Sequence, residues 1–183
     1  IANQSLHHVV ELEHLFSEVS HSLKESGRFI ISDMIGRNGH QRWPESLAIV
    51  NKIWDNMDEK YKYNNQFKRL DQRFVNWDYS GTGFEGIRSQ DILPELLKKF
   101  AFEFFLGYGN VVDVFIDRVF GPNFDAEDPV DRSFIDELHE IDVSSFRRRA
   151  LTPTHMYAVT RRQSYRGGCE TWQGIQPADC VRL

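Results

Sequence analysis

A helical pattern followed at once by a strand pattern is the sequence feature that most restricts the fold of this chain. Apolar residues recur at steps of three and four between Leu12 and Leu23, and Gly27 then provides a residue that commonly closes a helix. The next segment, Arg28 to Ile35, is short, apolar and rich in β-branched residues, which is typical of a buried parallel strand. A helix that leads directly into a buried strand predicts an α/β fold.

Later apolar segments extend this alternation of helices and strands. Helices are predicted at Pro44 to Met57, Asp91 to Phe100 and Val111 to Phe120, and strands at Phe102 to Leu106 and His155 to Thr160. Towards the C-terminus the periodicity is lost, and glycine and proline interrupt the chain. We therefore expect one α/β domain over residues 1–162 and an irregular tail over residues 163–183.

Composition limits the classes of function. The chain has 183 residues, 40% of them hydrophobic, and its 22 basic against 27 acidic side chains leave a formal charge of −5. This is the composition of a globular domain without the basic surface that binds phosphate backbones, so we expect no nucleic-acid partner. Apolar runs are far shorter than the ~18 residues of a membrane helix, so we expect no membrane partner. The two cysteines, Cys169 and Cys180, lie too near the C-terminus to staple a core, which favours a cytoplasmic protein.

Two local patterns resemble ligand sites but lack the context that those sites need. Gly81 to Gly86 reads G-x-G-x-x-G, yet polar residues precede it where a dinucleotide-binding loop requires a hydrophobic strand. We interpret it as a flexible approach to the next helix. His7, Glu11 and His14 could form a metal site on one helix face. The same polar stripe continues to His21, however, which favours a solvated face and no metal.

Polar side chains also gather where open α/β sheets bind ligands, beyond the carboxyl ends of the strands. One polar segment, Asn3 to His8, precedes the first helix, and another, Asp33 to His40, follows the first strand. If the strands are neighbours, one cleft collects the polar residues of both segments, namely His7, His8, Asp33, Arg37, Asn38 and His40. Because imidazole titrates near neutral pH, these histidines suit removal of a proton from a hydroxyl or amine. The alternative is that these are loop residues without chemistry.

Two segments carry a family resemblance. Residues 4–16 read QSLHHVVELEHLF and residues 23–33 read LKESGRFIISD. They resemble the second half of the class I S-adenosylmethionine-dependent methyltransferases, in which a fourth strand ends in an SLHH-type segment and an LKPGG-type turn leads into the fifth strand. Here Glu25 and Ser26 replace the usual proline and glycine of that turn. By the same resemblance, Phe102 to Leu106 is the sixth strand and His155 to Thr160 the antiparallel seventh.

The resemblance implies a fold, a reaction and a set of site residues. The fold is the C-terminal half of a Rossmann-like methyltransferase sheet, with parallel strands, a final antiparallel strand and a helical insertion. The reaction is methyl transfer from S-adenosylmethionine to a small-molecule or sugar acceptor, a class suggested by residues 36–40 and 110–136. The implied cofactor-binding residues are Asn3, Gln4, Ser5 and Leu6, and the implied acceptor-binding residues are Asp33, Arg37 and Asn38. Since the sulfonium already activates the methyl group, one base suffices, for which the candidates are His7, His8 and His40.

The chain departs from the family pattern in the part that binds most of the cofactor. It contains no strand followed by a glycine-rich loop in the family position and no acidic residue at the end of a second strand. We therefore expect the chain to supply the acceptor-side half of the enzyme and, alone, to bind S-adenosylmethionine weakly or not at all. Its partner would be a second copy, in a homo-oligomer, or a missing N-terminal half. Two alternatives stay open, a non-catalytic self-associating module and a metal-dependent hydrolase built on His7, Glu11 and His14.

Overall fold

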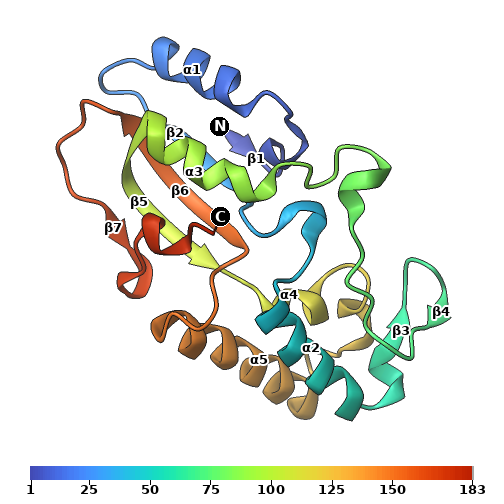
Figure 1. Cartoon of the computed structure of the whole chain (residues 1–183). Coiled ribbons are helices and arrows are strands. Elements are labelled where there is room, and N and C mark those ends of the chain that lie inside the picture. Colours follow the sequence, from blue (N-terminus) through green and yellow to red (C-terminus); the bar gives the residue numbers. More distant parts are fainter. Residues whose placement is uncertain (183) are drawn as a thin grey trace. The chain divides into compact units, whose positions relative to one another are not determined.

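The chain forms two compact units in a computed structural model that describes residues 1–182 (Figure 1). The first unit comprises residues 1–41, 77–108 and 152–182, and the second comprises residues 42–76 and 109–151. Residues 163–182 of the expected tail belong to the first unit, and the last residue of that tail, Leu183, lies outside the described residues.

The first unit is built on a mixed sheet with the strand order β1-β2-β6-β5-β7. Its strands are β1 (Ala2–Asn3), β2 (Phe29–Met34), β5 (Phe100–Tyr108), β6 (His155–Arg162) and β7 (Glu170–Thr171). Strand β1 runs parallel to β2, and β7 runs parallel to β5. Strand β6 lies between β2 and β5 and is antiparallel to both. The structure thus confirms an α/β class with a mixed sheet of parallel and antiparallel strands.

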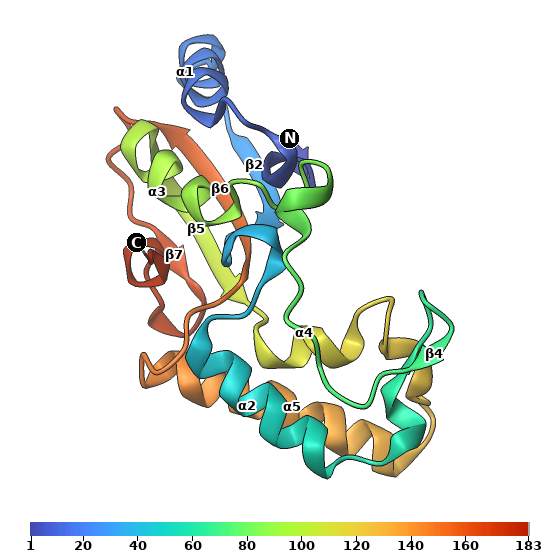
Figure 2. The same cartoon turned by 45° about the vertical axis from the view of Figure 1, so that its right-hand side comes forward.

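Helices pack on this sheet through an aromatic cluster. The helical elements of the first unit are α1 (Leu12–Ser22), α3 (Ser89–Lys99) and the short 3-10 turns η1 (Leu6–His8), η2 (Asn38–His40), η4 (Tyr79–Thr82), η6 (Trp172–Gly174) and η7 (Pro177–Cys180). Phe16 of α1 places its ring 6.5 Å from that of Phe29 in β2 and 6.2 Å from that of Phe100 in β5. Helix α3 lies over the sheet and against α1 (Figures 1 and 2). The apolar side chains whose spacing predicted these helices therefore face the strands.

The prediction that the polar stripe of the first helix begins at His7 is wrong. Helix α1 begins at Leu12, and His7 lies on the separate turn η1, where only 4% of the residue is exposed. His7 therefore does not share a helix face with Glu11 and His14, and the geometry on which that metal site depended is absent from the described residues. The physical reason is tertiary, because η1 forms hydrogen bonds to the end of β2 that a continuous helix would prevent.

The second unit is mainly helical. Its elements are α2 (Pro44–Asn56), α4 (Val111–Ile116), α5 (Pro129–Arg147), the hairpin of β3 (Tyr63–Asn64) and β4 (Arg69–Leu70), and the turns η3 (Glu59–Lys62) and η5 (Gly121–Asn123). Helix α4 contacts both α5 and α2 (Figure 2). The fully buried indole of Trp54 lies 4.8 Å from the ring of Phe120 and 6.2 Å from that of Phe115. The helix predicted over residues 111–120 ends early because the Asp117 carboxylate accepts the N–H groups of Val119 and Phe120 and forms a turn.

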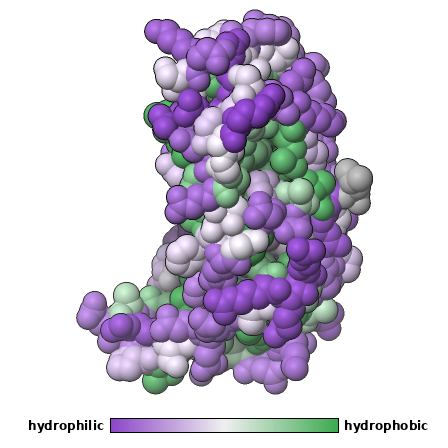
Figure 3. All heavy atoms as spheres, turned by 90° about the vertical axis from the view of Figure 1, so that its left-hand side faces the viewer, coloured by the Kyte–Doolittle hydropathy of each residue, from purple (hydrophilic) through white to green (hydrophobic). Residues whose placement is uncertain are grey.

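The surface is mixed in character. Hydrophilic side chains cover most of the face in Figure 3, and hydrophobic ones surface in smaller areas between them. Within residues 1–182, no helix has both the length and the apolar composition that crossing a membrane requires.

Asp142 is a buried carboxylate that joins two helices of the second unit. It lies on α5, is 1% exposed, and accepts the N–H groups of Val111 and Val112 at 2.9 and 3.1 Å. These N–H groups belong to the first turn of α4 and have no partner within that helix. Burial raises the pKa of Asp142 to about 6, although the two hydrogen bonds favour its ionised form. The folded protein therefore binds this proton more tightly than the unfolded chain does.

We predict that the contribution of Asp142 to stability grows as the pH falls. Because its folded pKa lies above its unfolded value, ionisation destabilises the folded state above pH 6 by about 3 kcal/mol, and this penalty disappears towards pH 4. The unfolding free energy of the wild type minus that of Asp142→Asn should therefore increase as the pH is lowered from 7 to 4, as measured in urea titrations. A difference that is constant or decreases over this range would show that the carboxylate is ionised in the fold throughout.

Candidate functional site

Asp33 places a fully buried carboxylate near the end of β2. Buried and partly exposed residues alternate along this strand, so Asp33 faces the same side as the apolar Phe29. Its Oδ2 atom accepts the backbone N–H groups of Ser5 and Leu6, both at 2.8 Å. Gln4 has a left-handed backbone with a φ of 47°, which turns the chain out of β1 and directs these two amides towards β2.

The same carboxylate fixes the imidazole of His7. Oδ1 of Asp33 lies 2.6 Å from Nδ1 of His7. Burial alone would raise the pKa of Asp33. The hydrogen bonds from His7, Leu6 and Ser5 together outweigh this effect and hold the pKa below its ordinary value. An ionised carboxylate only accepts hydrogen bonds, and Nδ1 of His7 therefore carries the hydrogen and donates it. In the neutral ring the lone pair then lies on Nε2, which is the nitrogen that can accept a proton or bind a cation.

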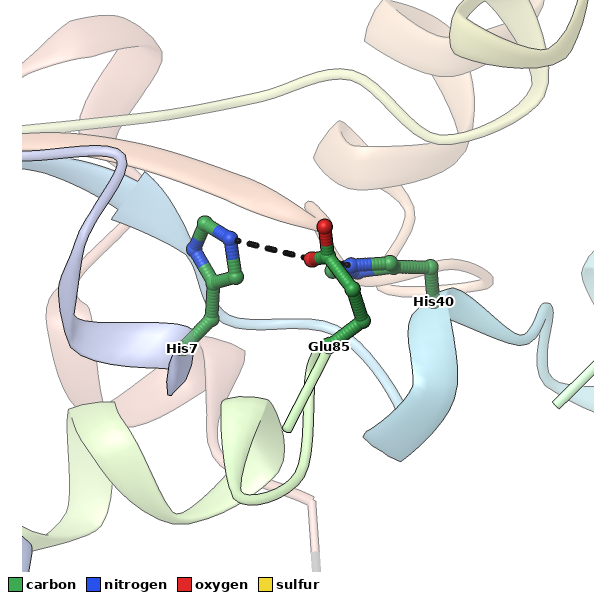
Figure 4. A group of neighbouring side chains, drawn as sticks. All are labelled: His7, His40 and Glu85. Atoms are coloured by element: carbon green, nitrogen blue, oxygen red, sulfur yellow. Dashed lines mark hydrogen bonds and ion pairs between the residues drawn. The ribbon is translucent and has the colours of Figure 1, made fainter. Parts of the chain in front are cut away.

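Glu85 and His40 complete a cluster around this nitrogen (Figure 4). Oε2 of Glu85 lies 3.6 Å from Nε2 of His7 and 3.2 Å from Nε2 of His40. The Glu85 side chain is 44% exposed, so the cluster is accessible from solvent. Burial alone would raise the pKa of Glu85. The hydrogen bond from His40 and the charges of the surrounding histidines together outweigh this effect and hold the pKa below its ordinary value.

Two glycines bring the Glu85 loop close to His40. The N–H of Gly39 donates to the carbonyl of Gly86 at 2.9 Å, and both residues have left-handed backbones, with φ values of 66° and 63°. A Cβ atom on Gly86 would lie 2.9 Å from Cε1 of His40, which is closer than such atoms approach in proteins. Glycine is therefore required at residue 86 both by its backbone conformation and by the space available.

Hydrogen bonds on the C-terminal side of Glu85 tie the loop to η1 and α1. The N–H of Ile87 donates to the carbonyl of His7 at 3.1 Å. The guanidinium of Arg88 donates to both carboxylate oxygens of Glu13 at 2.7 Å and to Asp91 at 2.8 Å. The hydrogen bond from Arg88 lowers the pKa of Glu13 to about 2. The backbone that carries Glu85 is thus held next to the backbone that carries His7.

The structure brings the three sequence-predicted bases together. His7 and His8 are adjacent, with ring centroids 4.0 Å apart, and the ring of His40 lies 5.4 Å from that of His7. Nδ1 of His8 lies 3.2 Å from the carbonyl oxygen of Phe84, an acceptor, so this nitrogen carries the hydrogen. The His8 side chain is 43% exposed and lies at the rim of the cluster.

The other residues of the predicted ligand-binding segments differ in their exposure. Asn3, Gln4 and Ser5 are exposed, whereas Leu6 is buried. Arg37 is partly exposed. Hydrogen bonds from Ser80 hold the pKa of Asp78 below its ordinary value, and the charge of Arg37 adds a smaller effect in the same direction.

Asn38 forms a reciprocal pair with the start of α3. Its N–H donates to Oε1 of Gln90 at 3.3 Å, and its side-chain oxygen accepts the N–H of Gln90 at 3.1 Å. This pair fixes η2 next to α3, so Asn38 holds the loop that carries His40.

Glu85 is the site residue that sequence reasoning missed. It lies in the Gly81 to Gly86 segment, whose glycines predict only a flexible approach to a helix. The available signal was an acidic residue directly before a glycine in a segment with several turn-forming glycines. That signal did not indicate which histidines the carboxylate would meet, because the contact joins residues far apart in the chain.

The arrangement can perform two kinds of chemistry. Nε2 of His7 can accept a proton, because the Asp33 hydrogen bond orients the ring and stabilises the imidazolium that forms. His7, His40 and Glu85 also each offer one ligand atom within 4.8 Å of the other two, so the three side chains can converge on one cation. Comparisons with protein-family models, curated proteins and solved structures gave no match.

We predict that Gly86→Ala disturbs this cluster. The added methyl group would displace the His40 ring and force a left-handed alanine, which lowers the unfolding free energy by about 1–3 kcal/mol. Urea unfolding and the NMR shift of the His40 Cε1 proton measure the two effects. Gly81→Ala is the matched control, because a Cβ atom at residue 81 has nothing within 4 Å. Equal stabilities of the two variants would contradict the close approach of Gly86 to His40.

Proposed function

We propose that this chain forms the acceptor side of an S-adenosylmethionine-dependent methyl-transfer site that acts on a small molecule or sugar. The observation that carries the proposal is the buried hydrogen bond of 2.6 Å between Asp33 and Nδ1 of His7, which leaves Nε2 as the proton acceptor. A sulfonium methyl group needs no further activation, so the protein has to align the acceptor and remove its proton. His7 performs the second task as the general base.

The position of the cluster in the sheet supports this proposal. Strands β1 and β2 are parallel neighbours, and both η1 and the segment after Asp33 follow their carboxyl ends, where open α/β sheets bind ligands. The antiparallel strand β6 agrees with the seventh strand that the resemblance implies. In the same correspondence, β1 takes the place of the fourth strand and β2 that of the fifth.

The surrounding residues divide between the two ligands. We propose that the methionine end of the cofactor lies against the exposed side chains of Asn3, Gln4 and Ser5. Arg37 and the partly exposed His8 and His40 then line the acceptor side. Asn38 acts through Gln90 as a positioning residue for this loop.

Titration of the ¹⁵N-labelled chain with S-adenosylhomocysteine tests the cofactor side. We expect amide shift changes confined to residues 3–8 and 33–40, with weak affinity, on the order of millimolar, because this chain supplies only part of the cofactor contacts. Adenosine alone is the control, since it lacks the methionine end and should leave residues 3–6 unchanged.

One outcome would contradict the cofactor side of the proposal, namely shift changes confined to residues 42–76, which would place binding elsewhere. Absence of any shift change at millimolar ligand agrees with the expectation that the chain alone binds the cofactor weakly or not at all, and the His7→Asn variant described below then tests the proposal. Ligand-independent line broadening that grows with protein concentration, without a response to the ligand, would instead support a self-associating module.

The substitution His7→Asn separates the roles of the two ring nitrogens of His7. The Asn amide can still donate to Asp33 but offers no atom at the position of Nε2. We expect the unfolding free energy to change by less than about 1 kcal/mol and methyl transfer by the assembled protein to fall on the order of 10² to 10⁴-fold in kcat. KM for S-adenosylmethionine should not change. The exposed His21 of α1 provides the control His21→Asn. A His7→Asn variant with an unchanged kcat would exclude His7 as the base.

A further inference from the structure

We propose that His7, His40 and Glu85 form a binding site for one divalent transition-metal ion of the zinc class (Figure 4). The ligands are Nε2 of His7, Nε2 of His40 and a carboxylate oxygen of Glu85. This inference goes beyond the proposed function and does not depend on it, because it follows from the positions of these three side chains within the first unit.

The spacing of the ligand atoms fits a tetrahedral ion. Zinc lies about 2.0–2.2 Å from imidazole nitrogen and carboxylate oxygen, so two tetrahedral ligands are separated by about 3.4 Å. Oε2 of Glu85 lies 3.6 Å from Nε2 of His7 and 3.2 Å from Nε2 of His40. Closure of the set around an ion therefore requires side-chain shifts of only a few tenths of an ångström along these two edges.

The orientation of His7 is already that of a metal ligand. Metal-bound histidines commonly donate their other ring N–H to a carboxylate, which fixes the ring and increases the basicity of the ligating nitrogen. Asp33 accepts the Nδ1 hydrogen of His7 at 2.6 Å and is fully buried. The lone pair of His7 is thereby directed at the carboxylate of Glu85.

This juxtaposition needs a positive charge between the ligands. An imidazole lone pair and a carboxylate oxygen are both acceptors, and neither can hydrogen-bond to the other unless a proton or another cation lies between them. Glu85 obtains one hydrogen bond from the ring of His40 at 3.2 Å. A bound metal ion would satisfy all three atoms at once, and the neutral ring of His40 would then carry its hydrogen on Nδ1 instead of Nε2.

The set leaves the ion partly open. Two histidines and one glutamate are three protein ligands, as in zinc sites that keep a further position for water or substrate oxygen. Glu85 is 44% exposed, so an ion can enter from solvent, and His7 and His40 are anchored at 5% and 22% side-chain exposure. A metal at this position would use the lone pair that His7 needs as a base.

Metal titration of the full chain tests the inference directly. We expect calorimetry with Zn²⁺ to give one equivalent per chain with a dissociation constant in the micromolar range or tighter. Co²⁺ should give the visible absorption of a tetrahedral complex, and Zn²⁺ should displace it. Neither readout requires cofactor, acceptor or methyl transfer.

Substitutions identify the ligands. Glu85→Gln and His40→Ala should each weaken Zn²⁺ binding at least tenfold, and Asp33→Asn should weaken it on the order of 10 to 100-fold through His7. Glu85→Gln is the most informative variant, because the partly exposed side chain can be changed without loss of the fold, which circular dichroism verifies. His14→Ala is the control, since His14 is exposed on α1 and belonged only to the cluster expected from the sequence.

Three outcomes would overturn the inference. They are less than one equivalent of Zn²⁺ bound, binding that Glu85→Gln and His40→Ala leave unchanged, and binding that His14→Ala abolishes. Binding of S-adenosylhomocysteine and binding of Zn²⁺ are separate measurements, so failure of either proposal leaves the other standing.

Discussion

The hydrogen bonds of Asp33 are the interaction on which the rest of the site depends. A buried carboxylate at the end of a strand is unfavourable by several kcal/mol unless donors replace the water it has lost. Asp33 has such donors in the amides of Ser5, Leu6 and Met34 and in the ring of His7. The same bonds satisfy amides of η1 and set the tautomer of His7, so that the local fold and the chemistry have one physical cause.

The remaining members of the cluster are held through backbone contacts between distant segments. Gly39 bonds to Gly86, and Ile87 bonds to the carbonyl of His7, so the loop on either side of Glu85 is fixed to the turns that carry the histidines. Arg88 extends this attachment to Glu13 on α1. The backbone is therefore pre-organised, while the Glu85 side chain keeps partial exposure. This combination suits a site in which the last ligand adjusts when a cation or substrate enters.

The sequence predicts elements whose signals are local. The periods of 3.6 and 2 predicted α1, β2, α3, β5 and β6 to within a few residues, because the apolar faces that produce these periods also form the core. The gathering of His7, His8, Asp33 and His40 followed from the rule for strand ends. The burial of His7 and the role of Glu85 were not predictable in the same way. His7 leaves the helical stripe because of a bond to Asp33, and Glu85 reaches His40 through the Gly39–Gly86 contact, both of which join residues far apart in the chain.

Asp33 does not by itself decide between the two kinds of chemistry at this site. Its hydrogen bond to Nδ1 makes Nε2 of His7 both a better base and a better metal ligand, since a proton and a metal ion use the same lone pair. Glu85 makes the distinction. A general base needs no carboxylate opposite its lone pair, whereas a metal ion needs a further ligand at about the distance that Glu85 provides. The placement of Glu85 by two glycines and an arginine therefore adds to the site something that proton transfer alone does not require. It follows that the metal state and the proton-accepting state are alternatives on one molecule, and that the free metal concentration relative to its dissociation constant sets the balance between them.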